Sequence, residues 1–148
     1  MYVSSLYIRN IRAIADFKFE LRPSECAGWH VILGDNASGK SSLIKSLAII
    51  FAGGPKVSAS RQIWEDWLSQ GRDNGEIAVV INRDDSFDQY VLKGRQPETF
   101  TMRATIERKQ MDLAPGIPSE VTILFSQNSK TAERTIWANG NGWVSSSF

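Results

Sequence analysis

The chain has little that would allow covalent cross-links or a tightly held transition metal. Its 148 residues include one cysteine, Cys26, and one histidine, His30. A single cysteine excludes a disulfide within the chain, and one cysteine with one histidine is too few for a structural zinc site. We expect His30 to be structural, because it lies in the apolar run 29–33. The scarcity of cysteine is typical of a protein from the reducing cytosol.

Charge of one sign and long hydrophobic runs are missing as well. Seventeen basic residues face 16 acidic ones, a net charge of +1, so the overall balance points to neither nucleic acid nor membrane. The most apolar stretch, 47–52, is far shorter than the roughly 20 residues that span a bilayer. Residues 2–9 alternate and carry charge too early for a secretory signal. We therefore expect a soluble, cytoplasmic protein.

Alternation of apolar and polar residues predicts several half-buried β-strands. These strands are 2–9, 17–21, 77–81, 89–92, 100–107 and 121–125. The run 29–33 is apolar throughout, which predicts a strand covered on both faces. From about residue 75 onward, turn-rich segments separate the strands, and Asn139-Gly140 after 134–138 is a strong hairpin signal. The second half is therefore expected to consist of antiparallel hairpins.

Two helices are expected between these strands. The first, 40–51, is apolar nearly all round, which predicts burial, and Gly53-Gly54-Pro55 should stop it. The second runs from about Ser60 to Gln70, with Gly71 at its C-cap. Its apolar face consists of Ile63, Trp64, Trp67 and Leu68. For the two tryptophans, packing in the core is favoured over a surface for a partner.

A complete phosphate-binding motif lies between the apolar run and the first helix. Residues 34–41 read Gly-Asp-Asn-Ala-Ser-Gly-Lys-Ser and match G-x-x-x-x-G-K-[ST], the Walker A loop. Such a loop points successive backbone N–H groups at the phosphates, and the helix N-terminus adds its positive end. The candidate nucleotide-binding residues are Gly34, Asp35, Asn36, Ala37, Ser38, Gly39, Lys40, Ser41 and Ser42. The sequence thus predicts a site for ATP with magnesium.

The fixed positions of the motif have distinct expected roles. Gly34 and Gly39 allow unusual dihedral angles and a close approach of the backbone to phosphate. Lys40 brings a charge to the β- and γ-phosphates. The hydroxyl of Ser41 is the expected magnesium ligand, and Ser42 is placed to touch the α-phosphate.

The variable positions are less determined by the motif. A carboxylate that faced phosphate would be repelled, so Asp35 is expected to point to solvent or to cap the turn. Asn36 either forms hydrogen bonds within the loop or reaches toward the γ-phosphate.

The order of these features resembles the N-terminus of the SMC/RecF group of ABC-type ATPases. The resemblance rests on Ile8-x-Asn10-Ile11-Arg12, a short strand, and the loop Asn36-Ala37-Ser38-Gly39-Lys40-Ser41, and covers about the first third of the chain. The group includes DNA-repair and chromosome-organising ATPases, the overcoming-lysogenization-defect nucleases and anti-phage defence ATPases. Chromosome-type members usually have glycine at the position of Ala37. In having alanine there, the chain more closely resembles the stand-alone defence ATPases. By position, Arg12 resembles the family arginine near the nucleotide phosphates; an ion-paired or solvated surface arginine is the alternative.

Several motifs of a complete ABC-type ATPase are not in the sequence. There is no Ser-Gly-Gly signature and no apolar run ending in Asp-Glu, since Glu65-Asp66 belongs to the expected tryptophan helix. Gln127 is a poor candidate for the magnesium-sensing glutamine, because 128–130 resemble a turn. We therefore expect no catalytic residue in this chain. Residues 1–148 are interpreted as the N-terminal part of an ATPase head, truncated at the C-terminus.

The fold class expected is α/β, a P-loop NTPase forming lobe I of an ABC ATPase head, with a mixed sheet and an antiparallel β-subdomain. The resemblance implies hydrolysis only when the rest of the head and a second head complete the site, as in a head-to-head homodimer. It also implies DNA or a nuclease as partner, in DNA repair, chromosome organisation or anti-phage defence, and no membrane. Two alternatives are a small complete P-loop kinase or nucleotide transferase, with several βαβ units, and a non-catalytic module that docks nucleotide.

Overall fold

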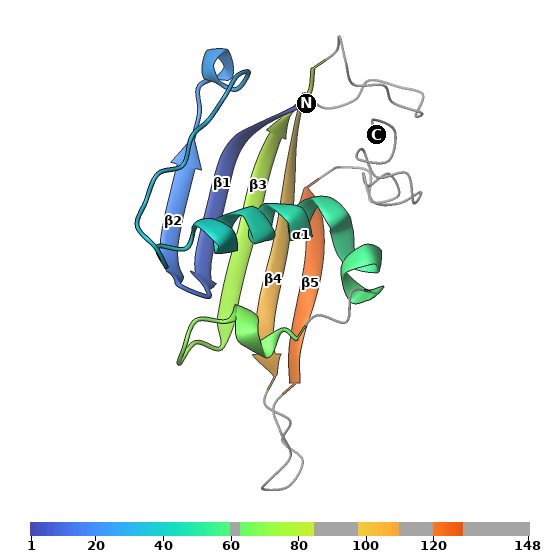
Figure 1. Ribbon diagram of the computed structural model, residues 1–148. Coiled ribbons are helices and arrows are strands. Elements are labelled where there is room, and N and C mark those ends of the chain that lie inside the picture. Colours follow the sequence, from blue (N-terminus) through green and yellow to red (C-terminus); the bar gives the residue numbers. More distant parts are fainter. Residues whose placement is uncertain (60–62, 85–97, 110–119, 129–148) are drawn as a thin grey trace, which may run out of the picture.

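A computed structural model of the chain describes residues 1–59, 63–84, 98–109 and 120–128. Five strands form one sheet in the order β2-β1-β3-β4-β5 (Figure 1). They are β1 (Tyr2–Ile11), β2 (Ile14–Glu20), β3 (Asn74–Asn82), β4 (Thr99–Lys109) and β5 (Glu120–Asn128). Every neighbouring pair is antiparallel. The α/β class and the antiparallel second half are therefore confirmed, whereas the described sheet is antiparallel throughout rather than mixed and contains no βαβ unit.

Some expected elements lie outside the described residues and stay predictions. They are the strand 89–92 and the hairpin 134–140. Gln127 lies in β5 and pairs with Met102 of β4.

One face of the sheet carries the core because the strands alternate in burial. Every second residue of β3 and β4 is buried, including Ile77 and Val79 on β3 and Met102 and Ile106 on β4. The helix α1 (Lys40–Ala59) lies across this face (Figure 1). Its buried residues Leu43, Ile50 and Val57 join the same cluster. Burying a side chain of this size stabilises the fold by about 1.5–3 kcal/mol.

The opposite face of the sheet is polar, and its arginines on the central strands are ion-paired. Arg103 Nη1 of β4 lies 2.7 Å from Glu76 Oε1 of β3, and Arg9 Nη2 of β1 lies 3.7 Å from Glu76 Oε2. Two positive charges therefore share one carboxylate that is itself half-buried, which reduces the positive potential of this surface.

The helix α1 departs from its expected form in its burial. Only one side packs against the sheet, so burial all round is wrong: Ile44 is 63% exposed and Ala48 is exposed. At the expected stop, Gly53 has φ 73° and ψ 168°, a non-helical conformation open to glycine, so the first helical stretch ends there as expected. A second helical stretch follows across this kink and runs as far as Ala59.

The second expected helix is wrong for the residues that the structure describes. Only Glu65–Trp67 form a short 3-10 helix, and Leu68 after it is extended, with φ −77° and ψ 139°. Leu68 forms an isolated β-bridge with Ile11, so tertiary pairing overrides the helical period. Trp67 and Leu68 are buried as expected, whereas Ile63 is 61% exposed.

The expected strand 29–33 is not formed either. These residues have no regular structure, and Trp29, Val31 and Leu33 are 100%, 78% and 87% exposed. A strand needs a hydrogen-bonded neighbour, and this segment pairs with none of the described strands. His30 is exposed, with an edge-on contact to the Phe19 ring and its Nε2 3.4 Å from Cys26 O.

Candidate nucleotide-binding site

The loop 34–39 turns from the exposed apolar segment into the first turn of α1. Ala37 and Gly39 take the left-handed region, with φ 65° and 96°. The Ser38 amide donates to Asp35 O at 3.2 Å, and the Leu43 amide donates to Gly39 O at 2.9 Å. These bonds curl the loop over the helix N-terminus, as an anion-binding loop requires.

The two motif glycines are needed for different reasons. A Cβ on Gly39 would add strain at its positive φ and would lie 2.9 Å from Ile14 Cγ1 of β2. Gly34 has no positive φ, so the expected unusual dihedral is wrong there; a Cβ would instead lie 2.7 Å from Ser38 Oγ. Ala37 carries a side chain at positive φ, which costs about 1–2 kcal/mol for an L-residue.

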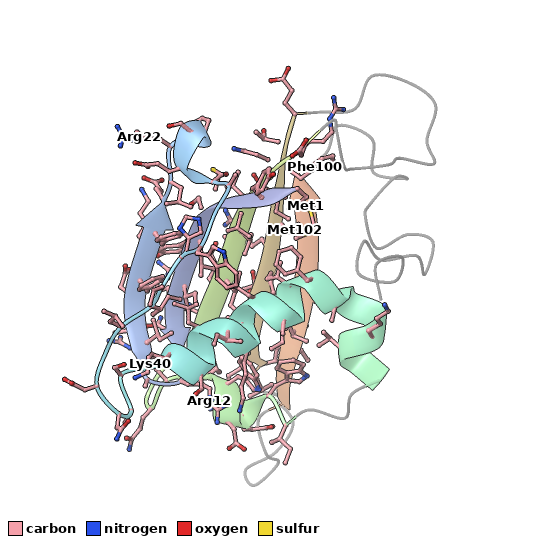
Figure 2. All side chains as sticks on the ribbon, turned by 45° about the horizontal axis from the view of Figure 1, so that its top comes forward. Met1, Arg12, Arg22, Lys40, Phe100 and Met102 are labelled. Carbon is pink, nitrogen blue, oxygen red and sulfur yellow. The ribbon has the colours of Figure 1, made fainter. Side chains whose placement is uncertain are left out.

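Lys40 ties the loop together. Its Nζ donates to Gly34 O and Asp35 O, both at 2.6 Å, and lies 3.5 Å from Ser38 Oγ. The ammonium is therefore held at the concave side of the loop by backbone oxygens. Figure 2 shows Lys40 at the start of α1, at the same end of the molecule as Arg12.

Arg12 approaches the loop from the β1–β2 turn. It has φ 52°, and the strand before it, expected over 2–9, runs on to Ile11. Its guanidinium carbon lies 5.5 Å from the centre of the Trp67 ring. In the described part of the chain no carboxylate forms an ion pair with Arg12, so the alternative of an ion-paired surface arginine has no support.

A cavity of about 490 Å³ joins these residues. It is lined by Arg12, Ala13, Asn36, Ala37, Ser38, Gly39, Lys40, Ser41, Ser42 and Lys45. Volumes of 300–1,000 Å³ are usual for small-molecule sites. Gly34 and Asp35 do not line the cavity, and the side chain of Asp35 is exposed. Among the described residues that line the cavity, three are cations and none is a carboxylate, so the potential there favours an anion.

Lys45 is the lining residue that sequence reasoning missed. It stands four residues after Ser41 on α1, so both point to the same side of the helix. That spacing was the available signal, because any charged residue one turn beyond a Walker A serine faces the same space.

Ser41 is the only residue of the expected metal site. It is exposed in the first turn of α1 and lines the cavity. The described residues contain no group of three or more His, Cys, Asp or Glu that could hold a metal. A single hydroxyl suits magnesium, which commonly takes its other ligands from water and substrate phosphates.

Comparison with known proteins identifies the family. The model of the AAA ATPase domain matches residues 1–136. The chain belongs to the AAA ATPase domain family. Membership of this family assigns the chain an ATPase-type role and confirms the expected class of protein. Within the described residues, no helix is both long enough and apolar enough to span a membrane.

Two similar proteins agree with this assignment of the chain to the AAA ATPase domain family. Septu protein PtuA of Bacillus mycoides (strain KBAB4) is 27% identical over 84 residues, covering 55% of this chain but 12% of that protein. A solved SMC ATPase, described for ATP-driven dimerization and DNA-stimulated activation, has a TM-score of 0.54 at 16% identity. That match covers 84% of this chain and 69% of the other, and it shows the fold. The family match thus confirms the expected class of ATPase, and the fold is similar to that of a solved SMC ATPase.

Proposed function

We propose that the chain binds ATP with magnesium through residues 34–42, as the N-terminal lobe of an ATPase. The observation that carries the proposal is the position of Lys40, whose ammonium is held by the oxygens of Gly34 and Asp35 at the edge of a cavity lined by cations. A triphosphate concentrates negative charge, and this cavity offers positive charge from several directions.

Backbone amides add to the side-chain charges. The first hydrogen bond of the helix runs from the Leu43 amide to Gly39 O. The amides of residues 40–42 precede it and therefore have no acceptor within the helix. Unsatisfied amides at a helix N-terminus bind anions, supported by the helix dipole. Ser41 would hold magnesium at the same turn, and Ser42 and Asn36 line the wall beside it.

We also propose that the remainder of the ATPase head covers the exposed apolar residues of two segments, 29–33 and the outer side of α1. Trp29, Val31, Leu33 and Ile44 are exposed, although the inner side of α1 packs in a well-formed core. A run that is apolar on both faces is typical of a parallel strand buried between layers. Residues 1–148 are thus proposed to be one lobe, with the groups for hydrolysis supplied from outside it.

Further partners are proposed by analogy with the relatives. The SMC neighbour is described for dimerization driven by ATP and activation stimulated by DNA. A head-to-head homodimer in the cytoplasm, with DNA or a nuclease as partner, fits that likeness. DNA repair, chromosome organisation and anti-phage defence are the corresponding roles.

Calorimetric titration of the chain with ATP and magnesium tests the site. Lys40→Ala removes a charge-assisted contact worth about 1.5–3 kcal/mol, so the affinity should fall roughly tenfold or more. Lys56→Ala, which removes an exposed lysine in the last turn of the same helix, is the matched control and should leave affinity unchanged. Equal affinity in Lys40→Ala and wild type would overturn the phosphate-loop assignment.

A further inference from the structure

The turn that carries Arg12 is clamped by a segment more than fifty residues away in the chain. The Arg12 amide donates to Trp67 O at 2.9 Å, and Ser69 Oγ donates to Arg12 O at 2.8 Å. The Ser69 amide donates to Asn10 O at 3.1 Å, and Leu68 bridges to Ile11. Both peptide groups of Arg12 are therefore bonded, which fixes the residue at its positive φ.

The same segment supplies an aromatic surface for the Arg12 side chain. The guanidinium carbon lies 5.5 Å from the centre of the Trp67 ring, within the range of a cation–π interaction. The ring itself is 2% exposed and packs against the Trp64 ring at 5.8 Å with an interplanar angle of 49°. Trp67 is thus a fixed support, whereas Arg12 above it is exposed.

An aromatic support differs from a carboxylate in what it leaves available. An ion pair would neutralise the guanidinium and would compete with any incoming phosphate. The Trp67 ring attracts the cation through its quadrupole and consumes none of its N–H donors, which remain for a bidentate contact. Holding the side chain in place beforehand also lowers the conformational entropy that a ligand would otherwise have to remove.

We propose that Trp67 is a positioning residue that holds the Arg12 guanidinium, uncompensated in charge, at the wall of the phosphate-binding cavity. The proposal rests on the proposed function, since it assigns the ring a role in nucleotide affinity. It makes the short segment 67–69 part of the site, although none of these residues lines the cavity. The ATP-binding site would then depend on three segments: the P-loop, the β1–β2 turn and the stretch after α1.

Nucleotide titrations of ring variants in the full chain test this role. Trp67→Leu removes the ring and keeps an apolar side chain, so ATP affinity should fall about two- to fivefold, the range of an exposed cation–π contact. Trp67→Phe keeps a ring and should restore most of the affinity. Because Nε1 of Trp67 is buried without a hydrogen-bond partner among the described residues, phenylalanine sacrifices no such bond.

A double-mutant cycle separates positioning from folding. In an Arg12→Gln background the further change Trp67→Leu should have no effect on affinity, because the group that the ring supports is gone. Ile81→Val, at a buried position toward the other end of β3, controls for lost stability and should leave affinity unchanged. An equal loss from Trp67→Leu with and without Arg12, or no loss in either background, overturns the proposal.

Two further measurements keep the outcome decisive. If Trp67→Leu does not fold, the change in tryptophan emission on adding ATP replaces it: wild type should show the change, and Arg12→Gln should show less of it. The same emission change in both proteins overturns the proposal. Failure of wild type to bind ATP at all contradicts the proposed function itself, whereas normal wild-type binding with unaltered ring variants contradicts the positioning role alone.

Discussion

Both sides of α1 carry large aliphatic residues, but the two sides lie in opposite environments. Leu43 and Ile50 on the inner side are buried against the sheet, whereas Ile44 on the outer side is 63% exposed. The inner side of α1 and the sheet thus share one core. The outer side of α1 and the run 29–33 leave apolar residues in water, and we infer that the site is the part of the molecule that depends on other segments.

The rate of ATP hydrolysis should show the largest dependence on segments outside this chain. The chain alone is expected to bind ATP and to turn it over negligibly, because the described lining of the cavity offers cations and no carboxylate to act on water. A positioned general base contributes about 10²–10⁴-fold, so the completed ATPase should be faster by at least that factor.

Steady-state phosphate release by the purified chain, compared with the longer protein, measures this difference. Lys40→Ala must abolish any turnover that is observed, which excludes a contaminating ATPase. Lys40-dependent turnover by the chain alone would show that the catalytic group is present within it.

Paired substitutions on α1 test the environments directly. Ile50→Ala, at a fully buried position, should lower the free energy of unfolding by about 2–5 kcal/mol. Ile44→Ala, which removes the same atoms on the outer side, should change it by less than about 0.5 kcal/mol. Urea denaturation of both variants gives the comparison, and equal losses would contradict an uncovered outer face.

The metal role of Ser41 predicts a smaller, conditional effect. Ser41→Ala should weaken ATP binding several-fold when magnesium is present, because its hydroxyl is the one protein ligand proposed for the ion. With magnesium chelated, the variant and wild type should bind alike. Titrations under both conditions decide the matter, and an equal loss in each would argue for a direct contact with phosphate instead.

The smallest effect concerns backbone strain in the loop. Ala37 lies at φ 65°, so Ala37→Gly should raise the free energy of unfolding, by less than about 1 kcal/mol after the entropy of glycine is included. Ala48→Gly, in the exposed interior of α1, should lower it by about 1 kcal/mol. Thermal unfolding of the two variants should therefore show shifts of opposite sign; shifts of one sign would mean that the loop relaxes in solution.

Local patterns predicted those parts of the fold that depend on local chemistry. Alternation located β3 and β4, and the motif spacing placed the loop ahead of Lys40, where α1 begins. Predictions failed where a distant neighbour decides the conformation. Leu68 is extended because Ile11 pairs with it, and 29–33 is no strand because it pairs with none of the described strands.

The candidate site shows the same division. Its loop follows from eight consecutive residues, and Arg12 followed from the family resemblance. The support of Arg12 by Trp67 joins segments more than fifty residues apart, and no sequence period indicates such a contact. Lys45 was predictable from helical spacing alone, since it lies one turn after Ser41.

The outermost strand, β2, limits how this chain can associate with other proteins. An exposed strand at the border of a sheet invites a foreign strand to add to it, with aggregation as the usual result. Alternate residues of β2 point outward, and three of them, Asp16, Lys18 and Glu20, are charged. Lys18 Nζ lies 3.0 Å from Glu20 Oε1. Charged side chains of this kind discourage edge-to-edge addition. We infer that these charges direct assembly away from the β2 border, toward the exposed apolar residues of 29–33 and of the outer side of α1.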